Sequence, residues 1–325
     1  MFCSAFLPQN YDLNKERNSN FSEEPALHIQ NTESEEPKEE TQKKFIKWID
    51  FNASLGILQK TNKAHRDLIK LGINDIGTCE LLAYIALKNG NSFNIKTDTT
   101  NLSKLIKELE KNDKSSIEKY YENKYYKYYV ESYHAILDGI INKDTGEVIG
   151  FHPIAKGFWH NGYNDFGNSR TYGYKRRHLG HDLYGGVGTP IIAMEGGTIT
   201  ELGWNRFGGW RIGIRSDDTH RYYYYAHLRK DNPYPEHLKL GDRVNAGDII
   251  GYLGVTGYST KENTNMSSAK PHLHFGIQII FDPSQEDGTG EIWIDVYNIC
   301  RFLSKNKTTV KHNPETKTYE RIVNL

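Results

Sequence analysis

Residues 189–204 have the sequence TPIIAMEGGTITELGW, and residues 210–228 have the sequence WRIGIRSDDTHRYYYYAHL. Both stretches contain short runs of β-branched and aromatic residues, separated by Gly-Gly or Asp-Asp pairs that favour tight turns. Asp217 and Asp218 are therefore predicted to form a hairpin turn. The same pattern continues in VNAGDIIGYLG, residues 244–254. The C-terminal half is predicted to be all-β.

Helical periodicity precedes this β pattern. One apolar stripe recurs every three or four positions after the capping candidates Asp98 to Thr100, at Leu102, Leu105, Ile106 and Leu109. A second stripe predicts a long helix and consists of Ile117, Tyr121, Tyr125, Tyr128 or Tyr129, Tyr133 and Ile136. These tyrosines could stack on sugar rings, but a helical aromatic stripe is more often core. An all-helical domain is predicted.

The whole chain is predicted to be an α+β multidomain protein, since 325 residues can form two ordinary domains. Residues 1–43 are expected to be a disordered or tether segment, because their Asn, Ser, Glu and Lys residues bury little apolar surface. The helical domain is placed at 44–145, the β domain at 146–304, and a C-terminal tail at 305–325.

The composition argues against several classes of protein. Lys plus Arg and Asp plus Glu number 41 each, so nucleic acid and anionic membrane surfaces are not indicated as partners. No run approaches the roughly 18 apolar residues that a transmembrane helix needs. Cys3, Cys79 and Cys300 lie far apart without a C-x-x-C spacing. They predict neither a disulfide framework nor a thiolate zinc site.

Histidines gather in three short segments of the β half. These are RRHLGHDL (176–183), YYAHL (224–228) and KPHLHFGIQ (270–278). Alternate side chains of a strand share a face, so His272 and His274 are predicted to point the same way. A single histidine of this kind would more often be solvated or a core residue, but three motifs together favour metal chemistry.

The same strand rule places His178, Gly180 and Asp182 on one face, with Gly180 leaving room for an ion. His181 is then expected to face away. Zinc favours imidazole nitrogen and carboxylate oxygen in a tetrahedral arrangement, and catalytic zinc keeps one position for water. His178, Asp182 and one histidine of the H-x-H pair are predicted to be three ligands. His227 and the other histidine are left to take a proton from metal-activated water during attack on an amide carbonyl.

Residues 170–276 resemble the lysostaphin-like (LytM-type) zinc endopeptidases, whose signature is H-x-x-x-D followed much later by H-x-H. Further strings that resemble the family are GVGTPIIAMEGGTI (186–199), WRIGIR (210–215), YYYYAHL (222–228), LKLGDRVNAGDIIGYLGVTGYST (238–260) and PHLHF (271–275). The resemblance implies that the zinc ligands are His178, Asp182 and His274. It also implies that His272 is the general base and that His227 helps to orient water and polarise the carbonyl.

A tyrosine just before the first ligand is thought to stabilise the oxyanion in this family. Tyr172 sits where that residue is expected, with Tyr174 as a close competitor. Arg170 and Arg177 flank the same motif and could contact a substrate carboxylate, although a structural ion pair is the simpler interpretation.

The resemblance implies a duplicated hybrid motif of the barrel-sandwich type and a substrate in the stem peptides or cross-bridges of bacterial peptidoglycan. Sugar-phosphotransferase proteins share this architecture but lack the carboxylate that is present here as Asp182. The implied function is a zinc metalloendopeptidase. The alternative is a zinc- and wall-binding scaffold or regulator with little or no peptidase activity. The presence of both His227 and His272 favours the enzyme, because a scaffold needs no proton-transfer residues.

A peptidoglycan substrate implies an extracytoplasmic protein, secreted or associated with the cell wall. Residues 1–8, MFCSAFLP, are too short for a complete export signal, so they are either the end of a signal or an untethered terminus. The sequence specifies neither the cleaved bond nor the oligomeric state. Four histidines without ligand spacing are expected on the surface or in loops: His152, His160, His220 and His237.

Overall fold

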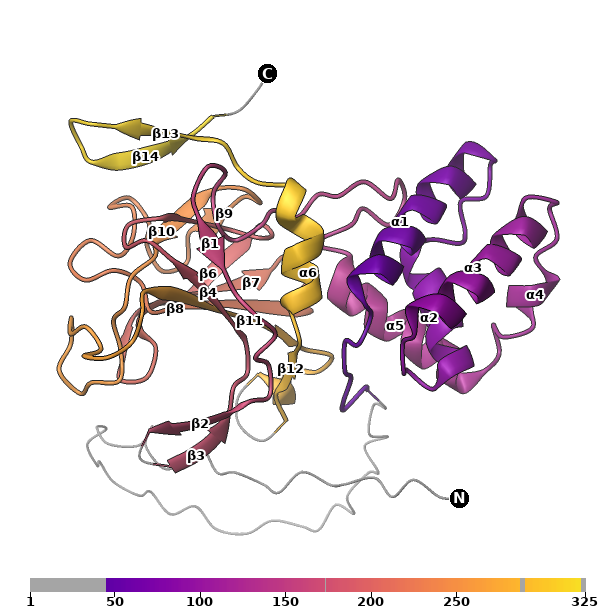
Figure 1. Ribbon diagram of the computed structural model, residues 1–325, viewed down its shortest axis with the longest axis horizontal. Helices are drawn as coiled ribbons and strands as arrows, with labels where there is room; N and C mark the ends of the chain where they lie inside the picture. The colour runs from indigo at the N-terminus through magenta and orange to yellow at the C-terminus, as the bar shows by residue number, and fades with distance from the viewer. Residues whose placement is uncertain (1–44, 173, 287–289, 323–325) are drawn as a thin grey trace, which may run out of the picture.

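The computed structural model describes residues 45–172, 174–286 and 290–322, and the tether predicted for residues 1–43 lies outside them. A helical region comes first and a β-rich region follows, which confirms the predicted α+β order (Figure 1). None of the described helices is both long and apolar enough to cross a membrane.

The helical region packs around buried Leu, Ile, Ala and Tyr side chains. Its described helices are α1 (Leu55–Lys70), α2 (Thr78–Asn89), α3 (Ile95–Leu109), α4 (Ser115–Glu118) and α5 (Lys124–Leu137). The predicted cap of the helix at Leu102–Leu109 is wrong by one turn. Asn94 is the N-cap of α3, since its side chain accepts hydrogen bonds from the backbone N–H groups of Lys96 and Thr97.

The long helix predicted between Ile117 and Ile136 is also wrong, because those residues form α4 and α5 with a break between them. The break has a local cause. The side chain of Asn123 accepts hydrogen bonds from the backbone N–H groups of Tyr125 and Tyr126 and starts a new helix there. The new start turns Tyr126 into the core and leaves Tyr125 exposed.

Among the described residues, the β-rich region contains one large antiparallel sheet and three separate two-stranded pairs. Its strands are β1 (His160–Asn161), β2 (Ser169–Tyr172), β3 (Tyr174–Arg177), β4 (His181–Gly185), β5 (Pro190–Ile192), β6 (Gly197–Asn205), β7 (Gly209–Ser216), β8 (Arg221–Ala226), β9 (Arg243–Val244), β10 (Ile249–Tyr252), β11 (His272–Ile279), β12 (Ile292–Ile294), β13 (Val310–Asn313) and β14 (Thr318–Arg321). The large sheet has the order β1-β4-β11-β8-β7-β6-β9, with β12 also paired to β11.

The central strands of the large sheet have two different faces. On β11, Leu273, Phe275 and Ile277 are fully buried in the core, whereas His272 and His274 alternate with them on the opposite face. The predicted turn between β7 and β8 lies at residues 217–220, as the Asp-Asp pair indicates. The sequence pattern therefore predicts which face of the sheet carries the histidines.

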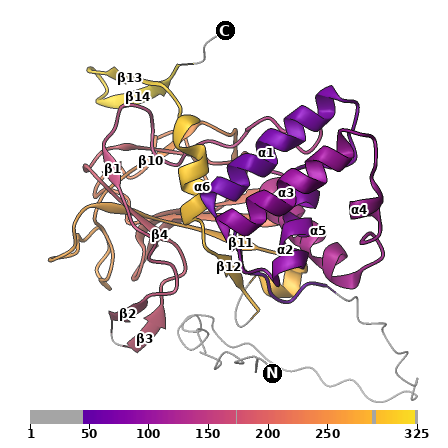
Figure 2. The ribbon, with the colours of Figure 1, turned by 45° about the vertical axis from the view of Figure 1, so that its right-hand side comes forward.

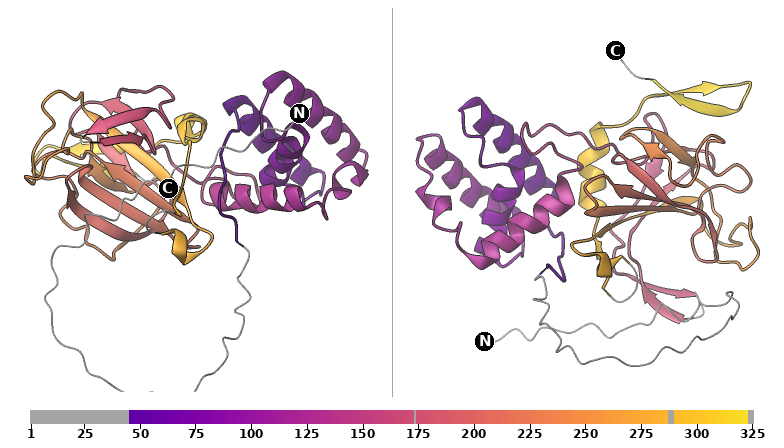
Figure 3. Two further views of the ribbon diagram at one scale, coloured as in Figure 1. Left: turned by 90° about the horizontal axis from the view of Figure 1, so that it is seen from below. Right: turned by 180° about the vertical axis from the view of Figure 1, so that it is seen from behind.

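Two segments differ from a simple all-β domain with a tail. Helix α6 (Tyr297–Phe302) follows β12, and the residues expected to form a tail, 305–325, include the hairpin β13–β14. Figures 2 and 3 show α6 between the helices and the strands. The side chain of Asn298 on α6 donates a hydrogen bond to the carbonyl of Ala53, 3.1 Å away. This helix therefore helps to join the two regions.

A buried arginine also joins them. Arg221, on β8, is 1% exposed and makes a two-pronged ion pair with Glu195, at 2.7 and 3.0 Å. Its third nitrogen donates to the carbonyl of Ala135 on α5, 2.7 Å away. Because this guanidinium is satisfied by groups from both regions, it fixes the last turns of α5 against the sheet.

Candidate metal and catalytic site

Three side chains converge on the histidine face of the large sheet. Nε2 of His178 lies 3.0 Å from Oδ1 of Asp182 and 2.8 Å from Nδ1 of His274. The same Nδ1 lies 3.1 Å from Oδ1 of Asp182. These three atoms form a triangle, and we call the three residues the donor triangle. They are the residues that the family resemblance implies as zinc ligands.

Strand pairing positions two corners of the triangle. In the antiparallel register of β4 and β11, Asp182 lies directly opposite His274, so their side chains share a face. His181 is paired with Phe275 and faces the core, where its ring contacts Tyr297. The predicted direction of His181, away from the candidate ligands, is confirmed.

The third corner is reached by a loop rather than by a strand. His178 precedes β4, so the prediction that His178, Gly180 and Asp182 alternate along one strand is wrong. The glycine is needed for a different reason from the predicted one, because the ring of His274, not an ion, occupies the space beside it. A Cβ atom at Gly180 would lie 2.7 Å from Cε1 and Nε2 of His274, which is closer than real Cβ contacts allow. Only glycine lets the loop bring His178 to the triangle.

Asp165 supports the triangle from behind, and the sequence analysis did not identify it. Its carboxylate lies 3.2 Å from Nδ1 of His178 and 3.3 Å from Nδ1 of His181, and it is 1% exposed. Arg170 contacts Asp165 at 2.7 Å and Asp182 at 3.2 Å. The structural ion-pair interpretation of Arg170 is therefore correct. Asp165 lies in a loop without ligand spacing, so no sequence signal distinguishes it.

Two further histidines lie beside the triangle. His227 follows β8, and its ring centroid is 4.7 Å from that of His272. Nδ1 of His227 lies 2.8 Å from the carbonyl oxygen of Thr256, and Nδ1 of His272 lies 2.7 Å from that of Lys270. A carbonyl oxygen can only accept, so Nδ1 of each ring carries a hydrogen and donates it. In the neutral form of each ring, the lone pair that can take a proton is therefore on Nε2.

His272 is the closer of the two to the donor triangle. Its Nε2 lies 3.9 Å from Oδ1 of Asp182. His227 has a backbone φ of 61° in the left-handed region, and its backbone N–H donates to the carbonyl of Gly208 at 2.7 Å. This hydrogen bond holds the unusual backbone angle and fixes the ring beside His272.

The electrostatics of the site favour a positive charge within the triangle. Burial opposes ionisation of Asp182, but hydrogen bonds from His178 and His274 prevail and lower its pKa below the ordinary value. Burial also opposes a charge on His178, but Asp165 and Asp182 raise its pKa to about 9. Burial, followed by His272 and His274, lowers the pKa of His227 well below its usual value. His227 is therefore neutral at neutral pH.

The donor set fits zinc. Two imidazole nitrogens and one carboxylate oxygen are ligands that zinc prefers, and catalytic zinc sites commonly have three protein ligands. One ligand atom from each of His178, Asp182 and His274 lies within 4.8 Å of the other two, close enough for one ion to bind all three. Asp165 adds the carboxylate that commonly orients a metal-binding imidazole through its second nitrogen.

The oxyanion-stabilising role suggested for Tyr172, or for its competitor Tyr174, stays a prediction. The two residues face each other in register at the end of the β2–β3 hairpin, and their side chains lie outside the part of the chain that the structure describes. The hairpin itself projects from the sheet (Figure 1).

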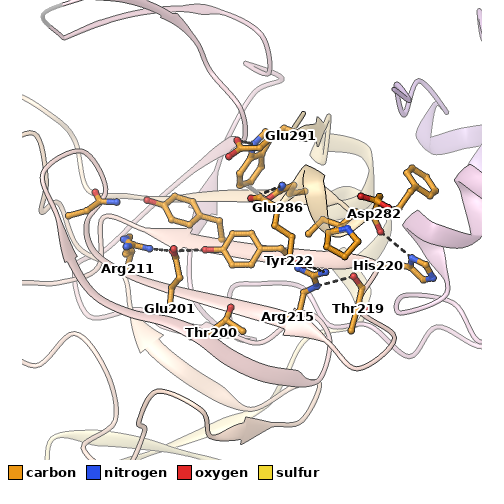
Figure 4. A pocket seen from close by; sticks show the side chains of 17 residues that line it. Thr200, Glu201, Arg211, Arg215, Thr219, His220, Tyr222, Asp282, Glu286 and Glu291 are labelled. Atoms are coloured by element: carbon orange, nitrogen blue, oxygen red, sulfur yellow. Dashed lines mark hydrogen bonds and ion pairs between the residues drawn. The ribbon is translucent and has the colours of Figure 1, made fainter. Parts of the chain in front are cut away.

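A groove lies on the same sheet face as the donor triangle. It has a volume of about 690 Å³ and is floored by Tyr222, Tyr224 and Gln278. The ring of Tyr224 lies 5.9 Å from that of His274, which connects the groove to the triangle. Figure 4 shows Arg211, Glu201 and Tyr222 linked across it. Its lining combines charged side chains with aromatic rings, so it offers both hydrogen-bonding and packing partners to a peptide.

Comparisons with known proteins agree with this site. The model of peptidase family M23 matches residues 176–286, a range that contains the donor triangle, His227 and His272. The chain is 39% identical over 112 residues to the L-Ala--D-Glu endopeptidase of Bacillus subtilis (strain 168), covering 34% of this chain and 32% of that protein. It is 46% identical over 100 residues to the glycyl-glycine endopeptidase ALE-1 of Staphylococcus capitis, covering 30% of this chain and 24% of that protein.

A solved structure gives a further match. The catalytic domain of the antimicrobial peptidase lysostaphin from Staphylococcus simulans is 33% identical, and the alignment covers 44% of this chain and 92% of that domain, with a TM-score of 0.33. The chain spans about a third or less of the curated relatives described above.

Proposed function

This chain belongs to peptidase family M23, and from that premise we propose that it is a zinc metalloendopeptidase that hydrolyses peptide bonds in bacterial peptidoglycan. The observation that carries the proposal is the donor triangle with His227 and His272 beside it. His178, Asp182 and His274 would hold the ion, and the family is zinc-dependent. When bound, zinc supplies Lewis acidity that polarises oxygen atoms next to it.

The residues of the chain supply the proton transfers. His272, whose Nε2 is directed towards the triangle, takes a proton from the attacking water and later gives it to the leaving amine. His227 is buried and neutral, and it orients the water and the carbonyl oxygen from the neighbouring position. The carbonyls of Lys270 and Thr256 keep both rings in the required tautomer.

The groove supports a peptide substrate. A stem peptide or cross-bridge can lie along Tyr222, Tyr224 and Gln278 and present one of its amides to the triangle. Residues 146–304 then form the peptidase domain and residues 44–145 a separate helical domain. Tyr172 is proposed to stabilise the oxyanion. The substrate also makes an extracytoplasmic location part of the proposal, and confinement of the full-length protein to the cytoplasm of its native host would contradict it.

A product analysis tests the proposed reaction. Purified walls with glycine cross-bridges and walls with directly linked stems are digested by the zinc-loaded protein, the zinc-stripped protein and the zinc-restored protein. Mass spectrometry of the released fragments is expected to show cleavage at one defined peptide bond, lost on stripping and regained with zinc. If the zinc-loaded protein binds the walls but releases no fragment from either type, the protein acts as a scaffold instead.

A further inference from the structure

A second cluster of metal-binding side chains lies in the helical region, where α2 begins and α5 ends. Sγ of Cys79, a ring nitrogen of His134 and a carboxylate oxygen of Asp138 all lie within 4.8 Å of one another. Nδ1 of His134 is 2.8 Å from Oδ1 of Asp138. These two residues are four positions apart, so they are neighbours on one face of α5. Cys79 faces them from the first turn of α2.

Glu80 holds the opposite edge of the same imidazole. Its Oε1 lies 2.8 Å from Nε2 of His134, while its Oε2 accepts a hydrogen bond from the backbone N–H of Gly77, 2.8 Å away. An imidazole that binds a metal through one nitrogen usually donates the other N–H to a carboxylate. Glu80 therefore leaves Nδ1 of His134 directed towards Asp138, with the thiol close by.

The surroundings suit an ion that enters from solvent. Cys79 is 5% exposed, whereas the side chains of His134 and Asp138 are each 29% exposed. A thiolate, an imidazole and a carboxylate together form a ligand set that favours zinc over magnesium or calcium. We propose that Cys79, His134 and Asp138 bind a second zinc ion, with Glu80 orienting His134, and that this ion ties α2 to α5.

Spacing rules do not find this cluster. The cysteines show no C-x-x-C pattern, and Cys79 and His134 belong to different helices. The competing explanation is that His134 is an imidazolium ion held between Glu80 and Asp138, with Cys79 as a buried thiol. Only a metal makes the sulfur a ligand, so the two explanations differ in a measurable property of Cys79.

Cobalt substitution separates them. The metal-free full-length protein is titrated with Co²⁺, and the near-ultraviolet thiolate-to-cobalt charge-transfer absorption is followed. The wild-type chain is expected to show this band, and added zinc is expected to remove it. Cys79→Ser should abolish the band, while Cys3→Ser and Cys300→Ser should retain it. Because His178, Asp182 and His274 contain no thiolate, the result is independent of the peptidase site.

Binding measurements complete the test. We expect two zinc ions per wild-type chain and one in Cys79→Ser, with the circular dichroism of the variant showing that the helices remain folded. The count of two includes the ion at the proposed peptidase site and so rests on the proposed function, whereas the cobalt band does not. Glu80→Gln should keep the band and weaken binding at this cluster about ten- to a hundredfold. The proposal is overturned if saturating Co²⁺ gives the wild type no thiolate band, or if the band survives in Cys79→Ser.

Discussion

Nε2 of His178 lies 2.8 Å from Nδ1 of His274, although 96 positions separate the two residues in the chain. Both nitrogens also lie about as close to Oδ1 of Asp182. Lone pairs at such distances repel one another unless a proton or a metal ion lies among them. The contact is therefore the clearest sign that this face of the sheet is built to hold a cation, and it links the H-x-x-x-D and H-x-H motifs directly.

Asp165 is predicted to strengthen metal binding without being a ligand. Asp165→Asn removes the negative charge beside Nδ1 of His178 while keeping the size of the side chain. We expect the affinity for zinc to fall about ten- to a hundredfold, as loss of such supporting carboxylates usually produces. Competition with a metal indicator measures this. Asp242→Asn, which changes an acid on the far side of β6, should bind zinc as the wild type does, and an unchanged affinity in Asp165→Asn would contradict the prediction.

Arg221 is predicted to be a major source of stability between the two regions. Arg221→Met leaves Glu195 without its buried partner and removes the hydrogen bond to Ala135. The free energy of unfolding should fall by roughly 3–5 kcal/mol, because breaking one side of a buried pair leaves an uncompensated charge. Denaturant unfolding checks this value.

An exposed ion pair provides the matched control for Arg221. The pair of Arg243 with Asp217 is more than half exposed on both sides. Arg243→Gln should change the free energy of unfolding by no more than about 1 kcal/mol. Equal losses for the two arginine variants would show that the buried position of Arg221 has no special effect.

His152 is predicted to make the fold sensitive to acid. Burial, with Lys307 and His160 adding to it, lowers its pKa from 6.5 to about 3. In the unfolded chain His152 is therefore protonated below about pH 6.5, whereas in the folded protein it stays neutral until the pH approaches 3. The contribution of His152 to the free energy of unfolding is fully present above about pH 6.5. It is lost as the pH falls from there towards 3, by up to about 1.4 kcal/mol per pH unit.

His152→Gln should reduce this slope. Thermal unfolding measured between pH 7 and 4 is expected to show a shallower loss for the variant than for the wild type. His237→Gln, at an exposed position, should follow the wild type. A wild-type slope in His152→Gln would mean that this ring is not the acid-sensitive group.

The sequence predicts the candidate ligands and histidines better than it predicts the loops and supporting residues around them. Alternation along a strand places His272 and His274 on one face, and the structure confirms it. The rule fails for His178, because a loop rather than β4 brings that ring to the triangle. Asp165 could not be predicted, since only the tertiary fold brings its loop behind the triangle.

The helical half shows a similar limit. The apolar stripes correctly predict helices, but the position of a cap depends on which Asn, Asp or Thr reaches the free N–H groups, and Asn94 and Asn123 take that role. Histidine burial is equally hard to predict. His152 is expected in a surface loop, yet it is 2% exposed because the backbone N–H of Ile154 donates to its Nδ1 and the ring packs against His160.

The most direct test of the central claim is the release of new amino groups from purified peptidoglycan by the wild type and by His272→Ala, with the zinc content of both determined. We expect release by the wild type and equal zinc content in the variant, with a rate lower by about 10² to 10⁴, since His272 transfers protons and binds no metal. Release by a fully metallated His272→Ala at the wild-type rate would contradict the role of His272 in proton transfer.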